Sequence, residues 1–351
     1  MSSKCQLTIN GKSVSALVGA TVLDAALAAR IAMPHDCCTG QCDSCRVTVE
    51  GGVDDHGTRE GATVLGCQAT LTGHASITFE EAPAVGARMA SVSSIRPLSP
   101  DIDEVTLELN SPLRYLPGQY VKLSFKGLPE RDYSPTLGLG GEADVNRLYF
   151  HVRRYPMGRF SSAIGQAIKV GSRLKVRGPY GHAWLRQGTG PLVLVASGTG
   201  FAPIWSIAVA ARLGQPDRPI TVIAGARDPA DLYMRQAFAW LSARGVRYLT
   251  LTTSGGPAFA DMRAGRPTDA LPALGPDHTV YAAGAPAMVA AVKRIAQDAG
   301  AVCYADPFVM NETPASLTQK LGRFFQMTNW GSRSGEPGAA ATPRPLRSGT
   351  I

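Results

Sequence analysis

The sequence predicts three folded domains of different classes: a small α+β unit at residues 1–86, an antiparallel β-barrel at 87–187 and an α/β unit with a parallel sheet at 188–310. Short alternating apolar and polar runs between Gly and Pro turns predict the barrel. Continuous apolar strands, each followed by a helical stretch, begin near Gly190 and predict the parallel sheet. A chain of 351 residues is long enough for two or three such cores.

The first domain has two clear local signals. Asn10-Gly11 is a strong hairpin turn. Thr21, with Asp24 three residues later, predicts the cap of a helix that runs to about Arg30. Strands are expected at residues 6–9, 12–14, 46–50 and 77–79, the third of them closed by Gly51-Gly52.

The other two domains follow the same logic of strands between turns. Barrel strands are expected at residues 105–109, 119–125, 148–153 and 173–176, and parallel strands at 192–196, 220–224 and 279–283. Residues 192–211 are uncharged and long enough to span a membrane, but a Ser-Gly-Thr-Gly loop and Pro203 interrupt them, so we interpret them as a buried strand and helix. The extension at 311–351 is predicted to be largely disordered, because its end is rich in Gly, Ser, Pro and Ala.

The net charge of +8 is spread unevenly. Residues 1–86 carry five basic and nine acidic side chains, a balance of −4, so the remainder carries +12. No Lys/Arg run interleaved with aromatic residues is present, which argues against a nucleic-acid partner. The N-terminus lacks the apolar segment of a secretory signal, and we expect a cytoplasmic protein with reduced thiols and no membrane partner.

Four cysteines give the strongest chemical signal. The C-x4-C-x2-C…C spacing of Cys37, Cys42, Cys45 and the distant Cys67 is the plant-type ferredoxin spacing, which holds a [2Fe–2S] cluster with four thiolates. Structural zinc prefers paired short spacings, and disulfides need an oxidising compartment, so both alternatives fit less well. The other cysteines, Cys5, Cys38 and Cys303, are expected to be small buried or half-buried packing residues.

Three motifs in the predicted barrel together favour a flavin nucleotide. An Arg at position 131 can grip a diphosphate with two hydrogen bonds, Tyr133 can stack on a planar ring, and the Ser134 hydroxyl can bond a ring nitrogen. The Gly158–Ser161 segment is expected to open a helix whose free N–H groups suit a phosphate. The Gly-Pro-Tyr-Gly run at 178–181 then closes the barrel.

Loops after the parallel strands suit a dinucleotide. The run Gly198-Thr199-Gly200 lets the backbone approach a diphosphate at a helix N-terminus. Gly284 follows a later strand, at the edge where nicotinamide would be held.

The loop after the second parallel strand is where an adenosine ribose would lie. Its Asp228 and Asp231 favour NADH, since a carboxylate accepts a hydrogen bond from a 2′-hydroxyl and repels a 2′-phosphate. Arg227 beside them leaves NADPH possible.

Taken in order, these motifs resemble the ferredoxin–NAD(P)+ reductase superfamily over residues 5–308. The ferredoxin-first order resembles the NAD(P)H-dependent reductase components of bacterial aromatic ring-hydroxylating (Rieske) dioxygenases, down to the segments 64–68 and 304–308. The resemblance implies a β-grasp ferredoxin domain, an FAD barrel and an NADH domain. It implies that electrons pass from NADH through FAD and the cluster, one at a time, to an oxygenase component or an intermediary ferredoxin.

The resemblance also implies residue roles. Tyr133 and Ser134 would lie against the reacting flavin ring. From its position in the sequence alone, Phe308 is expected to cover that ring until NADH displaces it. The cluster ligands would be Cys37, Cys42, Cys45 and Cys67, and the cofactor-binding residues Arg131, Tyr133, Ser134, His151, Arg153, Gly158, Ser161, Gly198, Thr199, Gly200, Arg227, Asp231, Gly284 and Phe308.

Two positions depart from the family pattern. Asp43 stands where Gly is usual, which would either lower the cluster potential or strain a backbone position that favours positive φ. Ala283 stands where relatives often have Cys beside the nicotinamide.

The acceptor leaves alternatives open. The reductase of a di-iron monooxygenase and that of a deoxysugar dehydrase, resembling CDP-6-deoxy-glucoseen reductase, share the same plan. A non-catalytic iron–sulfur module or redox sensor is an alternative of another class, and bleaching of a flavin band by NADH would exclude it.

Overall fold

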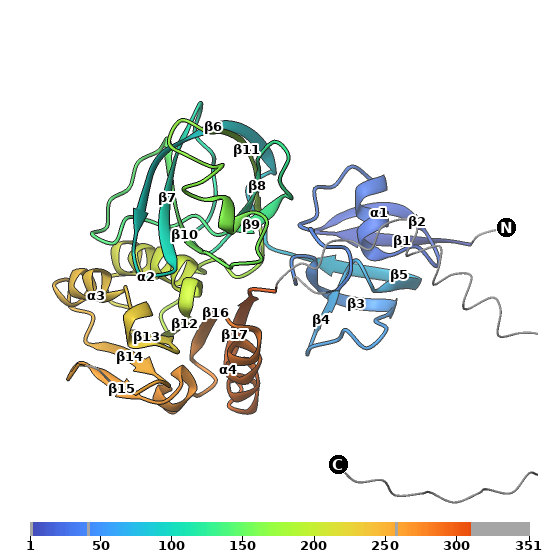
Figure 1. Cartoon of the computed structure of the whole chain (residues 1–351). Coiled ribbons are helices and arrows are strands. Elements are labelled where there is room, and N and C mark those ends of the chain that lie inside the picture. Colours follow the sequence, from blue (N-terminus) through green and yellow to red (C-terminus); the bar gives the residue numbers. More distant parts are fainter. Residues whose placement is uncertain (1–2, 41–42, 257–258, 310–351) are drawn as a thin grey trace, which may run out of the picture. The chain divides into compact units, whose positions relative to one another are not determined.

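The computed structural model describes residues 3–40, 43–256 and 259–309 (Figure 1). The chain divides into a compact unit, 1–308, and a second unit, 309–351. The predicted disordered extension at 311–351 therefore lies outside the described residues.

The N-terminal sheet surrounds one helix. Its strand order is β2-β1-β5-β3-β4, in which β1 and β5 pair in parallel and the other pairs are antiparallel. The elements are β1 (Lys4–Ile9), β2 (Lys12–Leu17), α1 (Val22–Ala28), β3 (Arg46–Asp54), β4 (Thr63–Leu65) and β5 (Thr70–Thr78).

Two predicted local signals in this sheet are confirmed, and one is wrong. Asn10 and Gly11 both have positive φ, and the Thr21 hydroxyl accepts a hydrogen bond from the Asp24 N–H at 3.0 Å. Gly51 does not close β3. The strand continues to Asp54 through a shift in register, because Gly51 at φ 101° makes a bulge opposite β5.

The second sheet is antiparallel and nearly closes on itself. Its order is β10-β7-β6-β11-β8-β9. An isolated bridge between Thr136 and Tyr149 joins the chain just after β9 to β10, which makes the sheet a barrel. The strands are β6 (Gly86–Pro97), β7 (Ile102–Leu109), β8 (Tyr120–Ser124), β9 (Arg131–Tyr133), β10 (Arg147–Arg153) and β11 (Arg173–Tyr180).

The third sheet is parallel throughout, in the order β15-β14-β13-β12-β16-β17. Its strands are β12 (Leu192–Ser197), β13 (Ile220–Ala226), β14 (Tyr248–Thr253), β15 (Met262–Ala264), β16 (Thr279–Gly284) and β17 (Val302–Pro307). Its α-helices are α2 (Phe201–Gly214), α3 (Arg235–Ser242) and α4 (Pro286–Asp298), with 3₁₀ turns η2 (Gly198–Gly200), η3 (Pro229–Asp231) and η4 (Pro267–Ala270).

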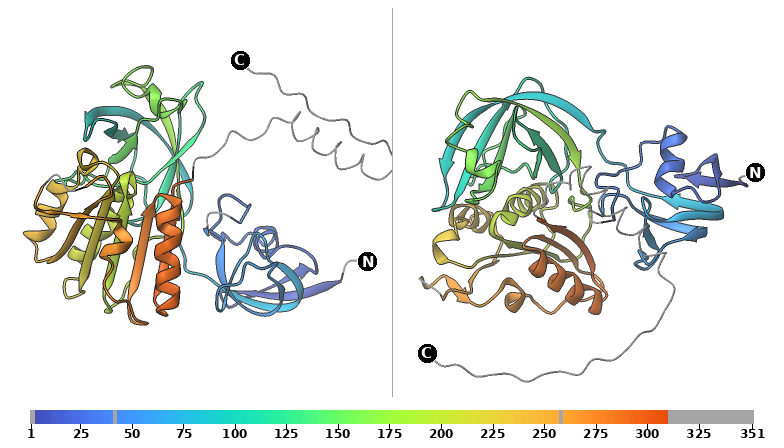
Figure 2. Two further views of the ribbon diagram at one scale, coloured as in Figure 1. Left: turned by 60° about the horizontal axis from the view of Figure 1, so that its bottom comes forward. Right: turned by 45° about the vertical axis from the view of Figure 1, so that its right-hand side comes forward.

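Alternate residues of the parallel strands face two different cores. Leu194 of β12 packs with α2 and α3, whereas its neighbour Val195 packs with α4, which lies along β17 (Figure 2). The chain leaves β12 toward β13 and later returns on the other side to β16. The carboxyl ends of β12 and β16 therefore form a topological switch point, where such sheets bind ligands.

The uncharged stretch at residues 192–211 forms β12, η2 and most of α2, as predicted. Among the described residues, no helix is both long enough and apolar enough to cross a membrane.

Candidate functional site

The proposed cluster ligands lie in the cysteine loop (residues 37–45) and in the turn after β4. Cys45 and Cys67 are 3% and 9% exposed. The Thr39 N–H donates to Cys37 Sγ at 3.4 Å, and the Gln68 side-chain amide donates to Cys67 Sγ at 3.4 Å. Such donors stabilise thiolates and tune iron–sulfur clusters. The sulfurs therefore suit the proposed role.

The fourth proposed ligand, Cys42, lies outside the described residues. Within the described ranges, no three Cys, His, Asp or Glu side chains already stand close enough to hold a metal ion.

Three described residues of the loop have left-handed backbone conformations. Cys38, Gly40 and Asp43 all have positive φ, at 53°, 80° and 52°. The expectation that the Asp43 position favours positive φ is therefore confirmed. Cys38 is not the packing residue that was predicted, since its side chain is exposed.

Asp36, which directly precedes the cysteine loop, joins it to the barrel. Lys122 Nζ of β8 lies 3.1 Å from Asp36 Oδ2, next to Cys37, and 2.9 Å from Asp132 Oδ1 of β9. Although burial opposes the charge of Lys122, these two carboxylates raise its pKa. The Tyr120 hydroxyl also donates to Asp36. The residue that leads into the cysteine loop therefore contacts the strand pair that carries Arg131 and Tyr133.

The proposed flavin residues lie at the end of β9 and in the segment after β10. Tyr133 is half-buried, with its ring 5.4 Å from that of Phe160, and burial raises its pKa. Ser134 is 6% exposed, and Arg131 Nη1 donates to the Glu130 carbonyl at 2.9 Å.

The segment that begins at Gly158 contains only a single 3₁₀ turn, η1 (Ser161–Ala163), and not the helix that was expected. The Ser161 hydroxyl accepts from the Tyr155 N–H at 3.1 Å, and a Cβ on Gly158 would lie 2.5 Å from that hydroxyl. Gly158 thus leaves room for this local turn.

His151 and Arg153 join the barrel to the parallel-sheet domain. His151 Nδ1 lies 3.0 Å from the Tyr233 hydroxyl, and its Nε2 is buried without a hydrogen-bond partner among the described residues. Arg153 pairs with Asp231 at 2.9 Å and with Asp101 at 3.0 Å. The unpaired His151 Nε2 is suited to a hydrogen bond with a bound ligand, since buried polar atoms are normally hydrogen-bonded.

Asp231 is more enclosed than its predicted ribose role requires. It is 9% exposed and also accepts from the Ser99 hydroxyl at 3.0 Å. Arg227, by contrast, is exposed, and Asp228 accepts from the Ala230 N–H at 2.9 Å. The exposed charged side chains of this loop are therefore Arg227 and Asp228.

The switch point is built from glycines that permit close approach. Gly198 has a φ of 54°. A Cβ added to it would lie 3.7 Å from Arg153 Nη2 and, apart from the adjacent chain, would have no other neighbour within 4 Å among the described residues. A Cβ on Gly200 would overlap the Ala283 carbonyl oxygen, and one on Gly284 would overlap that of Ser197. Thr199 lies between the first two in η2. This glycine-lined cradle suits a diphosphate.

The last strand brings two further residues to the same edge. The Phe308 N–H donates to the Gly284 carbonyl at 2.8 Å. Asp306, to which the sequence reasoning assigned no role, has a buried Oδ2 without a hydrogen-bond partner among the described residues. Burial, with a smaller effect of Asp132, raises its pKa to about 7. In the sequence, Asp306 was marked only by its place in the segment 304–308, which resembles the reductase family.

Family models match three parts of the chain. They describe a 2Fe-2S iron-sulfur cluster binding domain at residues 7–72, an oxidoreductase FAD-binding domain at 89–184 and an oxidoreductase NAD-binding domain at 194–294. The chain is 32% identical over 322 residues to the ferredoxin–NAD(P)+ reductase component of the naphthalene 1,2-dioxygenase system of Pseudomonas putida, which covers 85% of this chain and 96% of the relative. The chain belongs to the family of ferredoxin–NAD(P)+ reductase components of oxygenase systems.

Other similar proteins serve different oxygenase systems. The reductase component of the alkene monooxygenase system of Xanthobacter autotrophicus is 30% identical, with 78% of this chain and 90% of that relative covered. The crystal structure of the Amycolatopsis cytochrome P450 reductase GcoB has a TM-score of 0.65 at 29% identity and covers 87% of this chain and 98% of that one.

The predictions of fold class, cofactors and electron-transfer chemistry are thus confirmed. The protein is an NADH-dependent oxidoreductase with a β-grasp [2Fe–2S] ferredoxin domain, an FAD barrel and an NAD-binding α/β domain.

Proposed function

We propose that this reductase delivers single electrons to an oxygenase component, or to its intermediary ferredoxin, in aromatic ring hydroxylation. One observation carries the proposed order of transfer. Lys122 bridges Asp36, beside the ligand Cys37, and Asp132, within the Arg131–Tyr133 strand. This contact supports a cluster that receives its electron directly from the flavin side of the barrel.

The proposed roles of the chain's residues are binding and alignment. Bound FAD would supply the exchange between a two-electron hydride and single electrons. We assign Arg131 and Ser134 to the flavin, with Tyr133 against its ring, and Gly158 and Ser161 to its phosphate side. Close approach of two rings makes alignment the main demand on the protein.

We also assign residues to the binding of the nicotinamide dinucleotide. We propose that Gly198, Thr199 and Gly200 cradle its diphosphate and that Gly284 borders the nicotinamide, with Phe308 as the flavin cover. The paired Arg153 and Asp231, with His151, would fix the barrel beside this cradle, which supports a role in placing the two cofactors. Arg227 and Asp228 would then face the ribose.

We also propose the domain bounds 1–86, 87–187 and 188–310, with 311–351 as an extension. In support, the strands of each sheet fall within these ranges, except that β6 begins one residue early, at Gly86. A cytoplasmic location is proposed as well, since NADH and reduced thiols are supplied there.

Acceptor assays test the proposed function. The holoenzyme, with NADH and without oxygen, is mixed with a Rieske oxygenase or its ferredoxin, a di-iron monooxygenase or a cytochrome P450, and acceptor reduction is followed. We expect the Rieske components to be reduced fastest. Cys67→Ser should abolish transfer while NADH still bleaches the flavin. Faster reduction of the di-iron protein or the P450 would contradict the proposed acceptor.

A further inference from the structure

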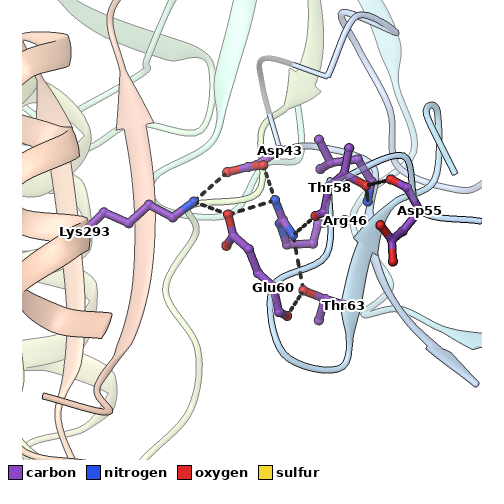
Figure 3. A network of polar contacts seen from close by, with 8 residues as sticks. Asp43, Arg46, Asp55, Thr58, Glu60, Thr63 and Lys293 are labelled. Atoms are coloured by element: carbon purple, nitrogen blue, oxygen red, sulfur yellow. Dashed lines mark hydrogen bonds and ion pairs between the residues drawn. The ribbon is translucent and has the colours of Figure 1, made fainter. Parts of the chain in front are cut away.

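Lys293 of α4 reaches from the NAD-binding domain to the cysteine loop. Its Nζ lies 2.8 Å from Glu60 Oε1 and 3.7 Å from Asp43 Oδ2 (Figure 3). The side chains of Lys293 and Asp43 are only 24% and 26% exposed. A contact between residues so distant in sequence, and partly shielded from water, joins two domains.

Arg46 holds the two acidic partners in place. Its side chain is 12% exposed, and its Nη2 lies 2.8 Å from Asp43 Oδ1 and 3.4 Å from Glu60 Oε1. Its Nη1 donates to the Thr58 carbonyl and the Thr63 hydroxyl, each at 3.3 Å (Figure 3). The acid positions are therefore fixed from within the ferredoxin domain, and Lys293 is the one member of this network that comes from another domain.

The network lies beside the proposed cluster. Asp43 stands between the ligands Cys42 and Cys45, and its φ of 52° is one of the left-handed conformations of the loop. Its carboxylate is therefore fixed one residue after Cys42 and two residues before Cys45 in the sequence. Net charge around an iron–sulfur cluster is one of the main determinants of its potential. An uncompensated carboxylate would make the cluster harder to reduce.

We propose that Lys293 is a positioning residue for electron transfer from the flavin to the cluster, an inference that rests on the proposed function. While Lys293 is in contact, the negative charges of the two carboxylates are balanced by the positive charges of Lys293 and Arg46. Without it, Asp43, Glu60 and Arg46 carry a net charge of −1. Contact with α4 thus favours loading of the cluster, and release of α4 makes the loaded cluster a stronger donor to an acceptor.

The other ion pairs between the domains also place the acid in the ferredoxin domain, which supports electrostatic docking of this domain on the rest of the reductase. Asp36 pairs with Lys122 at 3.1 Å, and Glu80 pairs with Arg186 at 2.7 Å. Within the described ranges, every ion pair between residues 1–86 and 87–308 has its acid in the ferredoxin domain. Salt screens such partly exposed pairs, so flavin-to-cluster transfer should slow as salt rises.

The test compares charge variants of the full, cofactor-loaded chain. The cluster potential is measured by titration followed by electron paramagnetic resonance, and rapid mixing with NADH times flavin bleaching and cluster reduction separately. Lys293→Gln should lower the flavin-to-cluster equilibrium constant by about threefold or more, or about 30 mV at ~59 mV per tenfold for one electron. Lys293→Arg should restore it, and Glu60→Gln should shift it in the opposite direction.

Arg294→Gln is the matched control. Arg294 is the next residue of α4 and is exposed, so its loss changes the total charge equally without touching the network. We expect Arg294→Gln to have the wild-type cluster potential and flavin-to-cluster equilibrium constant. The rate of flavin reduction by NADH should stay within about twofold of wild type in every variant, because the nucleotide cradle is not changed.

Two results would overturn the inference: an unchanged potential and unchanged salt dependence in Lys293→Gln, or an equal shift in Arg294→Gln. The cluster potential of Glu60→Gln should shift in the opposite direction to that of Lys293→Gln. If one of these two variants fails to fold, the other can therefore still refute the inference. Failure of the proposed function is distinguishable, since it would appear in the acceptor assay as faster reduction of a di-iron protein or a P450 by the wild-type protein, whereas failure of this inference appears in the cluster potentials of the variants.

Discussion

His151 is expected to make the barrel sensitive to acid, and His151→Gln is the change that tests it. The ring is 3% exposed on β10, and its Nδ1 lies 3.0 Å from the Tyr233 hydroxyl, its one hydrogen-bond partner among the described residues. Burial, with a smaller effect of Arg96, lowers the pKa of His151 to about 3. The folded protein therefore keeps this ring neutral at pH values where an unfolded chain would charge it.

The sign and size of the effect follow from this difference. The unfolded pKa is about 6.5, and each unit of difference is worth about 1.4 kcal/mol. Above about pH 6.5 the ring is neutral in both states, and as the pH falls toward 3 only the unfolded chain gains a proton, so stability is lost. At about pH 5 the loss amounts to about 2 kcal/mol. Glutamine can still bond Tyr233 but does not titrate.

Urea unfolding of the FAD-loaded chain at about pH 7.5 and about pH 5, followed by flavin fluorescence at fixed FAD, measures the effect. Between these conditions the wild-type protein should lose about 2 kcal/mol more than His151→Gln. His56→Gln, at a side chain that is 52% exposed, is the control for a His-to-Gln change at the surface. Equal losses in the wild-type protein and His151→Gln would refute the reasoning.

Three further predictions concern the nucleotide site. Gly200→Ala should raise the KM for NADH about tenfold or destabilise the domain by about 1–3 kcal/mol, because the new Cβ would overlap the Ala283 carbonyl; Gly214→Ala, where a Cβ meets nothing within 4 Å, should do neither. Phe308→Ala should change the rate of flavin reduction by NADH in rapid mixing, and an unchanged rate would remove Phe308 from the proposed site. Catalytic efficiency should be higher with NADH than with NADPH, because the exposed Asp228 repels a 2′-phosphate, and equal or greater efficiency with NADPH would contradict this.

Local signals were the part of the fold that the sequence predicted well. The Asn10-Gly11 turn and the Thr21 cap are set by neighbouring residues, and both form as expected. Positive φ at Asp43 was likewise expected from the position of a usual glycine. Among the strands that were not predicted, β9 and β15 have three residues each and leave no periodic pattern to detect. The longer strands β6, β14 and β17 were missed as well.

Contacts between distant residues could not be predicted. Lys293 and Glu60 carry ordinary helix and loop signals, and only the fold brings them together. The negative charge of the first domain and the positive charge of the remainder indicate that ion pairs between them are favourable. They do not indicate which residues form those pairs. The burial of Asp231 against Arg153 also depends on how two domains meet, so its sequence neighbour Asp228 looked equivalent to it.

The order of electron flow is tested most directly by mixing the anaerobic wild-type protein with NADH and following flavin and cluster in the same experiment. The purified chain should contain two irons and one FAD. We predict that the flavin bleaches first and that the signal of the reduced cluster follows at the flavin's expense. A cluster reduced before the flavin, or zinc in place of iron, would contradict the account.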